Sequence, residues 1–203
     1  MPEKPDSDKI GIIVTAARKR FAHYGLAKTT MNEIASDVGM SKASLYYYFP
    51  DKEHLFLEVV RVEMENFFTE TNELTSQSSS PAYQLQQYVD LRFNSFKDFI
   101  NLGKLASSHF ESVRSAFFPL NNDFLEREKK IVRDILQAGI NSDVFQDIDP
   151  DVHADLFVSV LRSLRVLMVK QRNDFLLTDE DYEQLKSYQT RFTTVFINGI
   201  SKK

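Results

Sequence analysis

Hydrophobic residues recur at helical spacing along most of the chain. The first such segment has apolar side chains three or four positions apart, which places them on one face of a helix: Ile10, Ile13, Val14, Ala17, Phe21 and Tyr24. Gly25 follows and predicts the end of this helix, because glycine readily takes the left-handed conformation found after a helix C-terminus. No segment shows the period-two alternation of a β-strand, and no internal repeat is seen. The pattern predicts an all-α fold.

Two short helices are predicted next, separated by a turn. Thr30 and Glu33 have the T-x-x-E spacing of a capping box, which begins the first of them. Gly39 tolerates the positive φ that a tight turn needs. Ser41 is a suitable N-cap for the second short helix, and Phe49 ends it because a proline disfavours helical geometry at the residue before it.

Longer helices are predicted over the rest of the chain. Asp51 can cap one that begins at Lys52, and the polar connector TNELTSQSSSP follows it. Prolines, acidic N-caps and glycines mark the limits of the others. The expected helices cover residues 52–71, 81–102, 105–116, 119–138, 150–172 and 178–198, with Gly139 ending the fourth and Asp149 capping the fifth.

The two short helices have the features of a helix-turn-helix unit. Ala35 is small enough to let them pack closely. Four side chains can form their shared core: Val38, Leu45, Tyr48 and Phe49. At about 100° per residue, Tyr46 and Tyr47 lie roughly 100° and 200° from Leu45 and therefore point outward. The three consecutive tyrosines of SKASLYYYF are thus divided between core and surface.

The outward face of the second short helix suits the major groove of DNA. Lys42 can donate to guanine, and Ala43 permits close approach or touches a thymine methyl group. Tyrosine hydroxyls can bind phosphates. Lys52, Thr29 and Thr30 adjoin helix N-termini, where free backbone N–H groups favour further phosphate contacts. The alternative is that the two outward tyrosines pack against another protein.

Composition and charge narrow the choice of partner and compartment. The chain has 203 residues and a net charge of −4, from 25 Lys and Arg against 29 Asp and Glu. Residues 1–60 hold eight of each sign, so only local cations can favour DNA. Cysteine is absent, which excludes disulfides and cysteine-based zinc sites. Neither a secretory signal nor a membrane-spanning run is visible, so we expect a cytoplasmic protein with no membrane partner.

The stretch TTMNEIASDVGMSKASLYYYFPDKEHLF resembles the N-terminal domain of the tetracycline-repressor (TetR) family of bacterial transcription regulators. The preceding ARKRFAHYGLAKTT is similar to the first helix of that family. The resemblance covers residues 7–66 and implies a three-helix helix-turn-helix DNA-binding domain, with the motif at about 30–49. Residues 67–203 would form a larger helical domain that binds an effector and dimerises. The implied function is a transcriptional regulator, by family default a repressor, that binds a palindromic operator as a homodimer.

The same resemblance implies roles for single residues. Phosphate contacts are expected from helix ends and outward tyrosines: Thr29 or Thr30, Ser41, Tyr46, Tyr47 and Lys52. Base-edge contacts are expected from the start of the recognition helix: Lys42, Ala43 and Ser44. Tyr48 packs inward by its angle, and in the family this position can also contact a phosphate. Ala43 stands where glycine is common, which affects the expected base preference.

The C-terminal helices carry the expected dimer interface. In the family, the last two long helices of each subunit form a four-helix bundle. The side chains expected on that face are Leu156, Val160, Leu164, Leu167, Tyr188, Phe192, Val195 and Phe196. The alternative is that the same side chains form a core within one subunit.

Phenylalanines gather in the region where the family binds effectors. Seven of the 17 fall within residues 92–124, a clustering that indicates an apolar pocket with Arg92 and His109 as polar anchors. These seven are Phe93, Phe96, Phe99, Phe110, Phe117, Phe118 and Phe124. The phenylalanine cluster predicts a small, apolar effector, and the resemblance implies that effector binding lowers operator affinity. The alternative is that these phenylalanines are ordinary core.

Two other functions are consistent with a helical protein. An enzyme is disfavoured because the chain has no H-E-x-x-H, G-x-G-x-x-G or P-loop motif, and no cofactor is expected. The acidic stretch DIDPDVHAD lacks the glycine and final glutamate of an EF-hand, and a capped helix start explains it, so no metal is expected. The other function is an adaptor that binds only proteins, which a DNA-binding experiment distinguishes.

Overall fold

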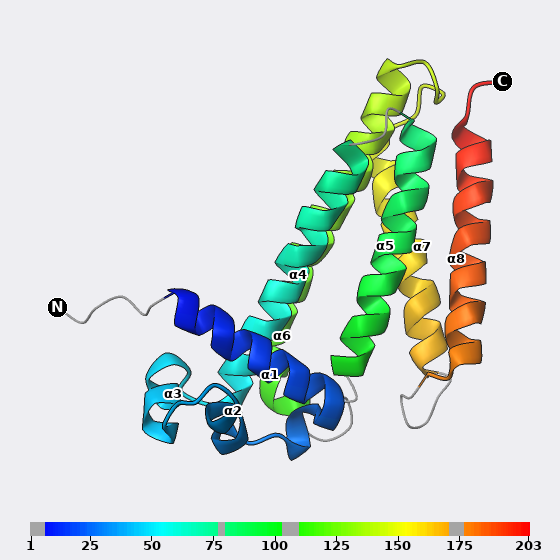
Figure 1. The fold of residues 1–203 in the computed structure, drawn as a ribbon. Coiled ribbons are helices and arrows are strands. Elements are labelled where there is room, and N and C mark those ends of the chain that lie inside the picture. The colour runs from blue at the N-terminus through cyan, green and yellow to red at the C-terminus, as the bar shows by residue number, and fades with distance from the viewer. Residues whose placement is uncertain (1–6, 77–79, 103–109, 171–176) are drawn as a thin grey trace. The chain divides into compact units, whose positions relative to one another are not determined.

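The computed structural model describes residues 7–76, 80–102, 110–170 and 177–203. Within these residues the regular structure consists of helices, and the all-α prediction is confirmed (Figure 1). In chain order the helices are α1 (Ser7–Lys28), α2 (Met31–Asp37), α3 (Lys42–Tyr48), α4 (Lys52–Ser76), α5 (Pro81–Leu102), α6 (Phe110–Asn141), α7 (Pro150–Lys170) and α8 (Asp179–Ile200). An isolated antiparallel bridge joins Phe145 to Ser201.

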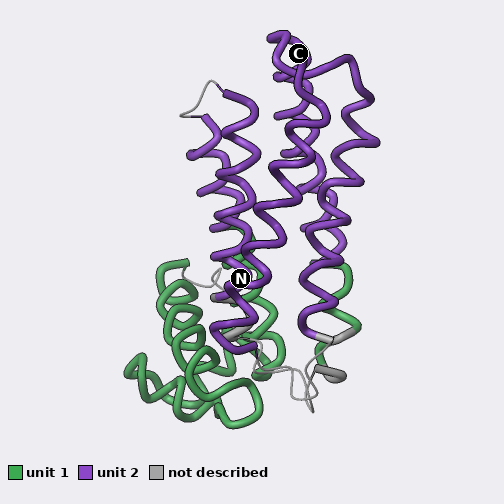
Figure 2. Tube along the Cα trace, turned by 90° about the vertical axis from the view of Figure 1, so that its right-hand side faces the viewer, with its two compact units in different colours: residues 1–65, 98–120 green, residues 66–97, 121–203 purple. Residues whose placement is uncertain are grey.

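The chain forms two compact units, shown in different colours in Figure 2. The first unit contains residues 1–65 and 98–120, and the second contains 66–97 and 121–203. Helices α4, α5 and α6 each contribute residues to both units. The division into functional domains at 7–66 and 67–203 stays a prediction, since the compact units group residues by packing alone.

The first unit is built around the buried faces of α1 to α4. Ile13, Ala17 and Phe21 of α1 are fully buried, as the helical spacing predicts. They pack in one cluster with Leu45 of α3 and with apolar residues of α2 and α4. The last residue of the predicted α1 face, Tyr24, is instead exposed, with the Arg20 guanidinium 5.9 Å from the centre of its ring.

The second unit has its own core, in which α7 packs against α8. Figure 1 shows that these two helices run in opposite directions. The Phe157 ring of α7 lies 5.4 Å from the ring of Phe192 and 4.7 Å from that of Phe196, measured between ring centres. Asp149 caps α7, since its carboxylate accepts from the backbone N–H groups of residues 151 and 152.

Three predicted helix limits differ from the structure. Helix α4 continues to Ser76 instead of ending at residue 71. Pro119 does not begin a helix but lies inside α6. Val113, before the proline, and Val132, after it, are each buried in a hydrophobic cluster, and this packing holds both parts of the helix in place. Gly139 does not end α6 either. A Cβ atom at this position would lie 2.1 Å from the Phe145 ring, so the glycine makes room for a buried side chain.

Candidate nucleic-acid interface

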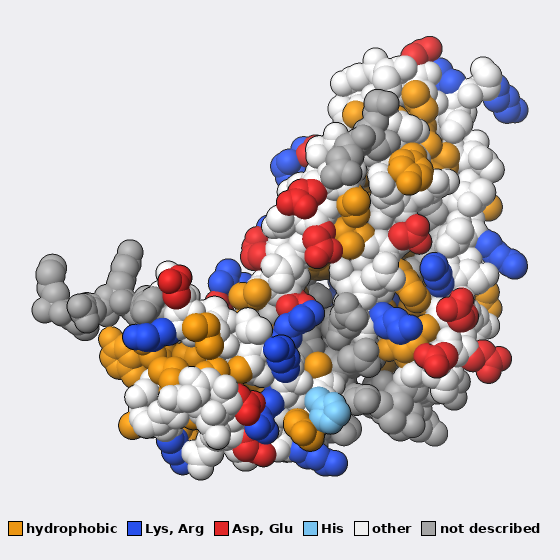
Figure 3. All heavy atoms as spheres, in the orientation of Figure 1, with side chains coloured by type: hydrophobic (Ala, Val, Ile, Leu, Met, Phe, Trp, Pro, Cys, Tyr) orange, Lys and Arg blue, Asp and Glu red, His pale blue; other side chains and the backbone are white. Residues whose placement is uncertain are grey.

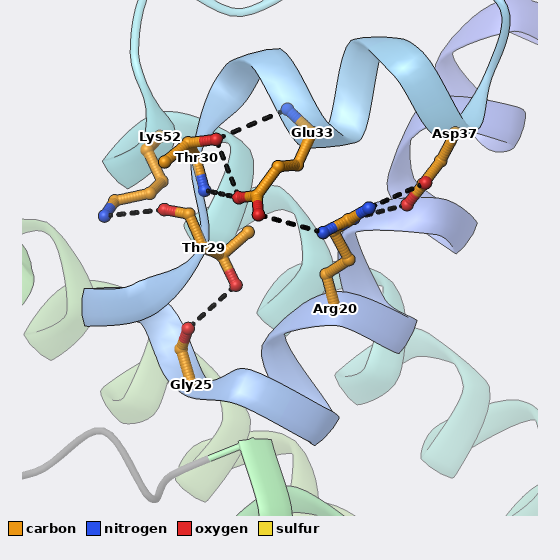
Figure 4. A network of polar contacts seen from close by, with 7 residues as sticks. All are labelled: Arg20, Gly25, Thr29, Thr30, Glu33, Asp37 and Lys52. Atoms are coloured by element: carbon orange, nitrogen blue, oxygen red, sulfur yellow. Dashed lines mark hydrogen bonds and ion pairs between the residues drawn. The ribbon is translucent and has the colours of Figure 1, made fainter.

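A capping box fixes the first turn of α2. The Thr30 hydroxyl accepts from the Glu33 backbone N–H at 3.3 Å, and the Glu33 carboxylate accepts from the Thr30 backbone N–H at 2.8 Å (Figure 4). The Thr30 hydroxyl and the Thr30 backbone N–H both donate to the Glu33 carboxylate, and these two hydrogen bonds lower the pKa of Glu33. The carboxylate stays ionised near neutral pH and lies at the positive end of the helix dipole, which favours it. The predicted T-x-x-E cap is confirmed.

Arg20 of α1 forms ion pairs with a residue in the first turn of α2 and with one in its last turn. Its guanidinium donates to the Asp37 carboxylate, with Nη2 2.8 Å from Oδ1, and its Nη1 lies 3.4 Å from the Glu33 carboxylate (Figure 4). The hydrogen bond from Arg20 lowers the pKa of Asp37. The sequence analysis missed this residue because nothing local marks it, and the pairing joins positions 17 residues apart.

The turn between α2 and α3 depends on the backbone conformation of Gly39. This residue has a φ of 64°, in the left-handed region that other residues adopt at a cost. The Met40 N–H donates to the Ala35 carbonyl at 2.9 Å, and the Gly39 N–H donates to the Ser36 carbonyl at 3.2 Å. An added Cβ would meet no atom within 4 Å, so conformation and not space selects glycine here.

Helix α3 begins at a serine cap and buries one side. The Ser41 hydroxyl accepts from the Ser44 backbone N–H at 3.1 Å. Leu45 is fully buried and Phe49 is 8% exposed, whereas Tyr48 is half-buried against the same cluster. The residue after α3 is extended, with a φ of −133°, as the following proline requires.

The opposite side of α3 is exposed. Lys42, Ala43 and Ser44 are exposed in its first turn. Tyr46 is 40% exposed and Tyr47 is 62% exposed. The Lys42 ammonium lies 5.7 Å from the centre of the Tyr46 ring. The helix therefore presents a cation, two small side chains and two phenols on one surface, while its other side holds the unit together.

Two further predicted phosphate contacts have internal partners. Thr29 is buried, and its hydroxyl donates to the Gly25 carbonyl at 2.8 Å. The Lys52 ammonium donates to the carbonyls of Leu26 and Thr29 at 2.6 and 3.0 Å. Thr30 is the exposed member of the threonine pair. The sequence could not show this, because both threonines adjoin the helix start and only packing distinguishes them.

Charged side chains of both signs cover the surface. On the face drawn in Figure 3, Lys and Arg side chains lie interspersed with Asp and Glu side chains. A net charge of −4 and this mixing give little long-range attraction for a polyanion. Binding to DNA would therefore depend on the few cations and hydroxyls near α3.

Comparison with known proteins identifies the family. Residues 13–59 match the family model of bacterial regulatory proteins, tetR family. A transcriptional regulator from Cytophaga hutchinsonii is 40% identical, and its crystal structure covers 96% of this chain and 99% of its own with a TM-score of 0.88. This chain belongs to the TetR family.

Other TetR-family proteins share the fold over nearly the whole chain. The transcriptional repressor KstR2 of Mycobacterium tuberculosis is 24% identical over 95% of this chain and 93% of its own length. A TetR transcription regulator from Haloarcula marismortui is 18% identical, and its structure covers 97% of this chain and 100% of its own with a TM-score of 0.74. The TetR-family chain described here is thus a transcriptional regulator and not an enzyme.

The phenylalanines that were expected to line one pocket of this TetR-family protein belong to both compact units. Phe93 and Phe96 belong to the second unit, as does Phe124, whose ring packs against Phe67 and Phe68. Phe117 packs on the core of the first unit, and Phe118 is 46% exposed. His109 and the side chains of Phe99 and Phe110 lie outside the described residues.

Arg92, the other expected anchor, is buried in the second unit. Its Nε donates to the Glu128 carboxylate at 2.5 Å, and the Tyr88 hydroxyl donates to the same carboxylate at 2.8 Å. All three residues are at least 95% buried. The role of Glu128 was not predicted, because α6 contains several acidic residues and no local pattern distinguishes this one.

The side chains expected at a dimer interface divide into three groups by exposure. Four are exposed: Leu156, Leu167, Tyr188 and Val195. Three are half-buried: Val160, Leu164 and Phe192. Phe196 is buried and belongs to the core within one subunit. Both alternatives of the sequence analysis therefore apply, to different residues of the same helices.

The described residues contain neither a metal centre nor a membrane span. No group of three or more His, Asp or Glu side chains there could hold a metal ion. Over the same residues, no helix is both long and apolar enough to cross a membrane.

Proposed function

We propose that this TetR-family regulator binds a palindromic operator as a homodimer, represses transcription from it, and is released by a small effector bound in the domain of residues 67–203. The DNA-binding part rests on the two faces of α3. Leu45 is buried on one face, whereas the other exposes Lys42, Ala43, Tyr46 and Tyr47. A helix fits the major groove, and these exposed side chains are of the kinds that read bases and bind phosphates there.

The proposed contacts follow from position along α2 and α3. Lys42 and Ala43 stand in the first turn of α3, where a recognition helix approaches base edges. Ser44 in the same turn is exposed and is proposed as a third base contact. The hydroxyls of Thr30 and Ser41, at the N-termini of the two helices, adjoin backbone N–H groups that favour a phosphate.

The tyrosines supply the remaining proposed phosphate contacts. Tyr46 and Tyr47 are exposed, and the Tyr48 ring lies edge-on to Tyr47 with 5.3 Å between ring centres. Tyr48 can therefore pack through its ring while its hydroxyl reaches toward DNA. Lys52 and Thr29 have hydrogen-bonded internal partners, so we assign them a supporting role in which they hold the start of α2 and α4 in place.

The DNA-binding part is tested by retardation of the promoter fragment upstream of the protein's own gene. We expect the wild type to retard this fragment and Lys42→Ala with Tyr47→Ala to lose the retardation. The control is Lys130→Ala with Tyr83→Ala, which removes an exposed lysine and an exposed tyrosine from α6 and α5. If the wild type binds no genomic fragment even at low salt, the proposal is wrong and the protein-binding adaptor is favoured.

The homodimer part rests on apolar side chains that one subunit leaves exposed. Leu156 and Leu167 of α7, and Tyr188 and Val195 of α8, are each at least 44% exposed. Burying such side chains against a second copy would remove apolar surface from water, which favours association. A two-fold symmetric dimer presents two recognition helices, and this explains why a palindromic operator is expected.

The dimer is tested by light scattering at micromolar concentration. The wild type is expected to have the mass of two chains, and Leu167→Glu with Val195→Glu is expected to have the mass of one. Tyr83→Glu is the control, because it places a charge at an equally exposed position on α5. A wild-type mass of one chain would contradict the proposal.

The effector part rests on the family and on apolar side chains of the second unit. Phe93 is buried and Phe96 is half-buried, and both lie on α5 with Arg92. We propose a ligand with a largely apolar body, whose binding lowers operator affinity through a coupling between the two sites. Since the target is DNA, the proposed site of action is the bacterial cytoplasm. Release of the DNA only by compounds without an apolar body would contradict this part.

A further inference from the structure

The cations of the first unit differ in what holds them in place. Arg20 is held by carboxylates, since its guanidinium donates to Asp37 and lies 3.4 Å from Glu33. The Lys52 ammonium is held by two backbone carbonyls, at 2.6 and 3.0 Å. Lys42 has neither kind of partner, because among the described residues its ammonium forms no hydrogen bond and no ion pair. Any order in the Lys42 side chain therefore comes from another contact.

The ring of Tyr46 supplies that contact. Lys42 and Tyr46 are four residues apart on α3, so they are neighbours on the same side of the helix. The Lys42 ammonium lies 5.7 Å from the centre of the Tyr46 ring, within the distance at which a cation is attracted to the electron-rich face of an aromatic ring. Both side chains are exposed, so the pair is accessible to a ligand in solvent.

A lysine that nothing holds discriminates poorly between base pairs. Its ammonium is carried on a flexible four-carbon stem, and fixing that stem at one base edge costs conformational entropy. A lysine that already lies against a ring has lost part of this freedom before DNA arrives. An ammonium has three N–H donors, and a ring on one side of it leaves the others free to donate to guanine O6 or N7.

We propose that Tyr46 is a positioning residue, whose ring holds the Lys42 ammonium in one place so that it discriminates between base pairs. This role rests on the proposed function, in which Lys42 contacts a base edge and the Tyr46 hydroxyl contacts a phosphate. The roles of the hydroxyl and of the ring are separable by substitution. Tyr46→Phe removes the hydroxyl and keeps the ring, whereas Tyr46→Leu removes both. Tyr46 is 40% exposed, so neither change disturbs the buried side of α3.

Retardation of the promoter fragment upstream of the protein's own gene measures both roles. Fragments in which single base pairs are changed show the position at which Lys42→Met loses discrimination. Tyr46→Phe should bind all fragments more weakly by the same factor and keep the discrimination at that position. Tyr46→Leu should lose it, as Lys42→Met does. It should also bind the original fragment about five- to thirtyfold more weakly than Tyr46→Phe, because each subunit of a dimer loses a contact that contributes about two- to fivefold.

Combining the substitutions isolates the interaction between the two side chains. When Lys42 is replaced by methionine, the ring has no cation to hold. Lys42→Met with Tyr46→Leu should therefore bind as well as Lys42→Met with Tyr46→Phe. Tyr24→Leu is the matched control, because Tyr24 is 53% exposed and its ring lies 5.9 Å from the Arg20 guanidinium. Arg20 is already held by Asp37, so losing this ring should leave the discrimination unchanged.

A measurement without DNA tests the contact itself. In proton magnetic resonance the current of an aromatic ring shifts the signals of a side chain above it. The shift of the Lys42 signals should persist in Tyr46→Phe and disappear in Tyr46→Leu. Lys28 is exposed on the same unit and has no ring contact among the described residues, so its signals serve as the reference.

Three results would each overturn the positioning role of Tyr46. The Phe and Leu variants could have equal affinity and discrimination, their difference could persist beside Lys42→Met, or the Lys42 signals could be the same in both. Retardation by the wild type separates this role from the proposed function. If the wild type retards no fragment, both are wrong; if it retards one and the two variants behave alike, only the positioning role is wrong.

Discussion

Replacing Arg165 by methionine should stabilise the ligand-free protein. Methionine keeps an unbranched stem and removes the guanidinium, which lies 4.8 Å from the centre of the Phe96 ring and forms no salt bridge among the described residues. The pKa of Arg165 is lowered to about 10 in the folded protein, mainly because its guanidinium is partly withdrawn from water. At 1.36 kcal/mol for each pKa unit, this corresponds to roughly 3 kcal/mol at neutral pH as an upper bound.

The sign and the net size follow from this shift. A cation whose pKa is lowered by folding destabilises the folded state at every pH below that pKa, and the cost disappears only as the pH rises above about 10. The cost is therefore fully present at pH 7. Partial access of water reduces it, and losing the contact between guanidinium and ring costs roughly 0.5–2 kcal/mol. We expect a net stabilisation of about 1 kcal/mol.

Urea unfolding at pH 7 measures this effect. A gain of about 1 kcal/mol raises the midpoint by roughly half a molar when the slope is near 2 kcal/mol per molar. Lys97→Met is the matched control, because it also removes a cation above an aromatic ring but at an exposed position, and should change stability by less than about 0.5 kcal/mol. A midpoint that falls in Arg165→Met would refute the argument, because it would mean that the arginine is satisfied within the subunit.

Three further predictions test the packing and the caps. Glu128→Gln leaves the buried Arg92 without its carboxylate and should lower stability by about 3–5 kcal/mol in the same urea assay, whereas exposed Glu126→Gln should stay within about 0.5 kcal/mol. Gly139→Ala forces a Cβ into the Phe145 ring and should cost about 1–3 kcal/mol, seen as a lower melting temperature. The capping hydrogen bonds lower the pKa of Glu33, so the stability that this carboxylate contributes is fully present above about pH 4.5. This stability is lost as the pH falls through the pKa of the folded state. The difference in unfolding free energy between the wild type and Glu33→Gln should therefore vanish in acid.

Features of the helix-turn-helix unit that depend on neighbours in sequence could be predicted from the sequence. The cap at Thr30, the turn at Gly39 and the burial of Leu45 each follow from spacings of three to five residues, and the structure has all three. The angle between successive residues of a helix was enough to separate buried Leu45 from exposed Tyr47. Local rules therefore described the surface proposed to meet DNA.

What the sequence could not predict depends on contacts between distant positions. Arg20 pairs with Asp37 across 17 residues, and Arg92 pairs with Glu128 across 36. Pro119 seemed to begin a helix because a proline fits a first turn, but packing on both sides keeps α6 continuous through it. The spacing of hydrophobic residues shows which face of a helix is buried. It does not show which other helix packs against that face, because the tertiary fold decides this.

The two units differ in how completely their polar groups are satisfied. Around α2, Arg20 meets Asp37 and Glu33, and the Lys52 ammonium donates to two carbonyls, so the scaffold that holds α3 needs no ligand to fix it. Inside the second unit, the Gln189 side-chain oxygen is shielded from solvent and accepts no hydrogen bond among the described residues, although buried polar groups normally have a partner. A ligand shifts a conformational equilibrium only when it binds one conformation more tightly than the other. The second unit, which leaves a buried polar atom unpaired, is therefore the one suited to rearrange around a ligand, and the first unit is the one suited to present a fixed surface to DNA.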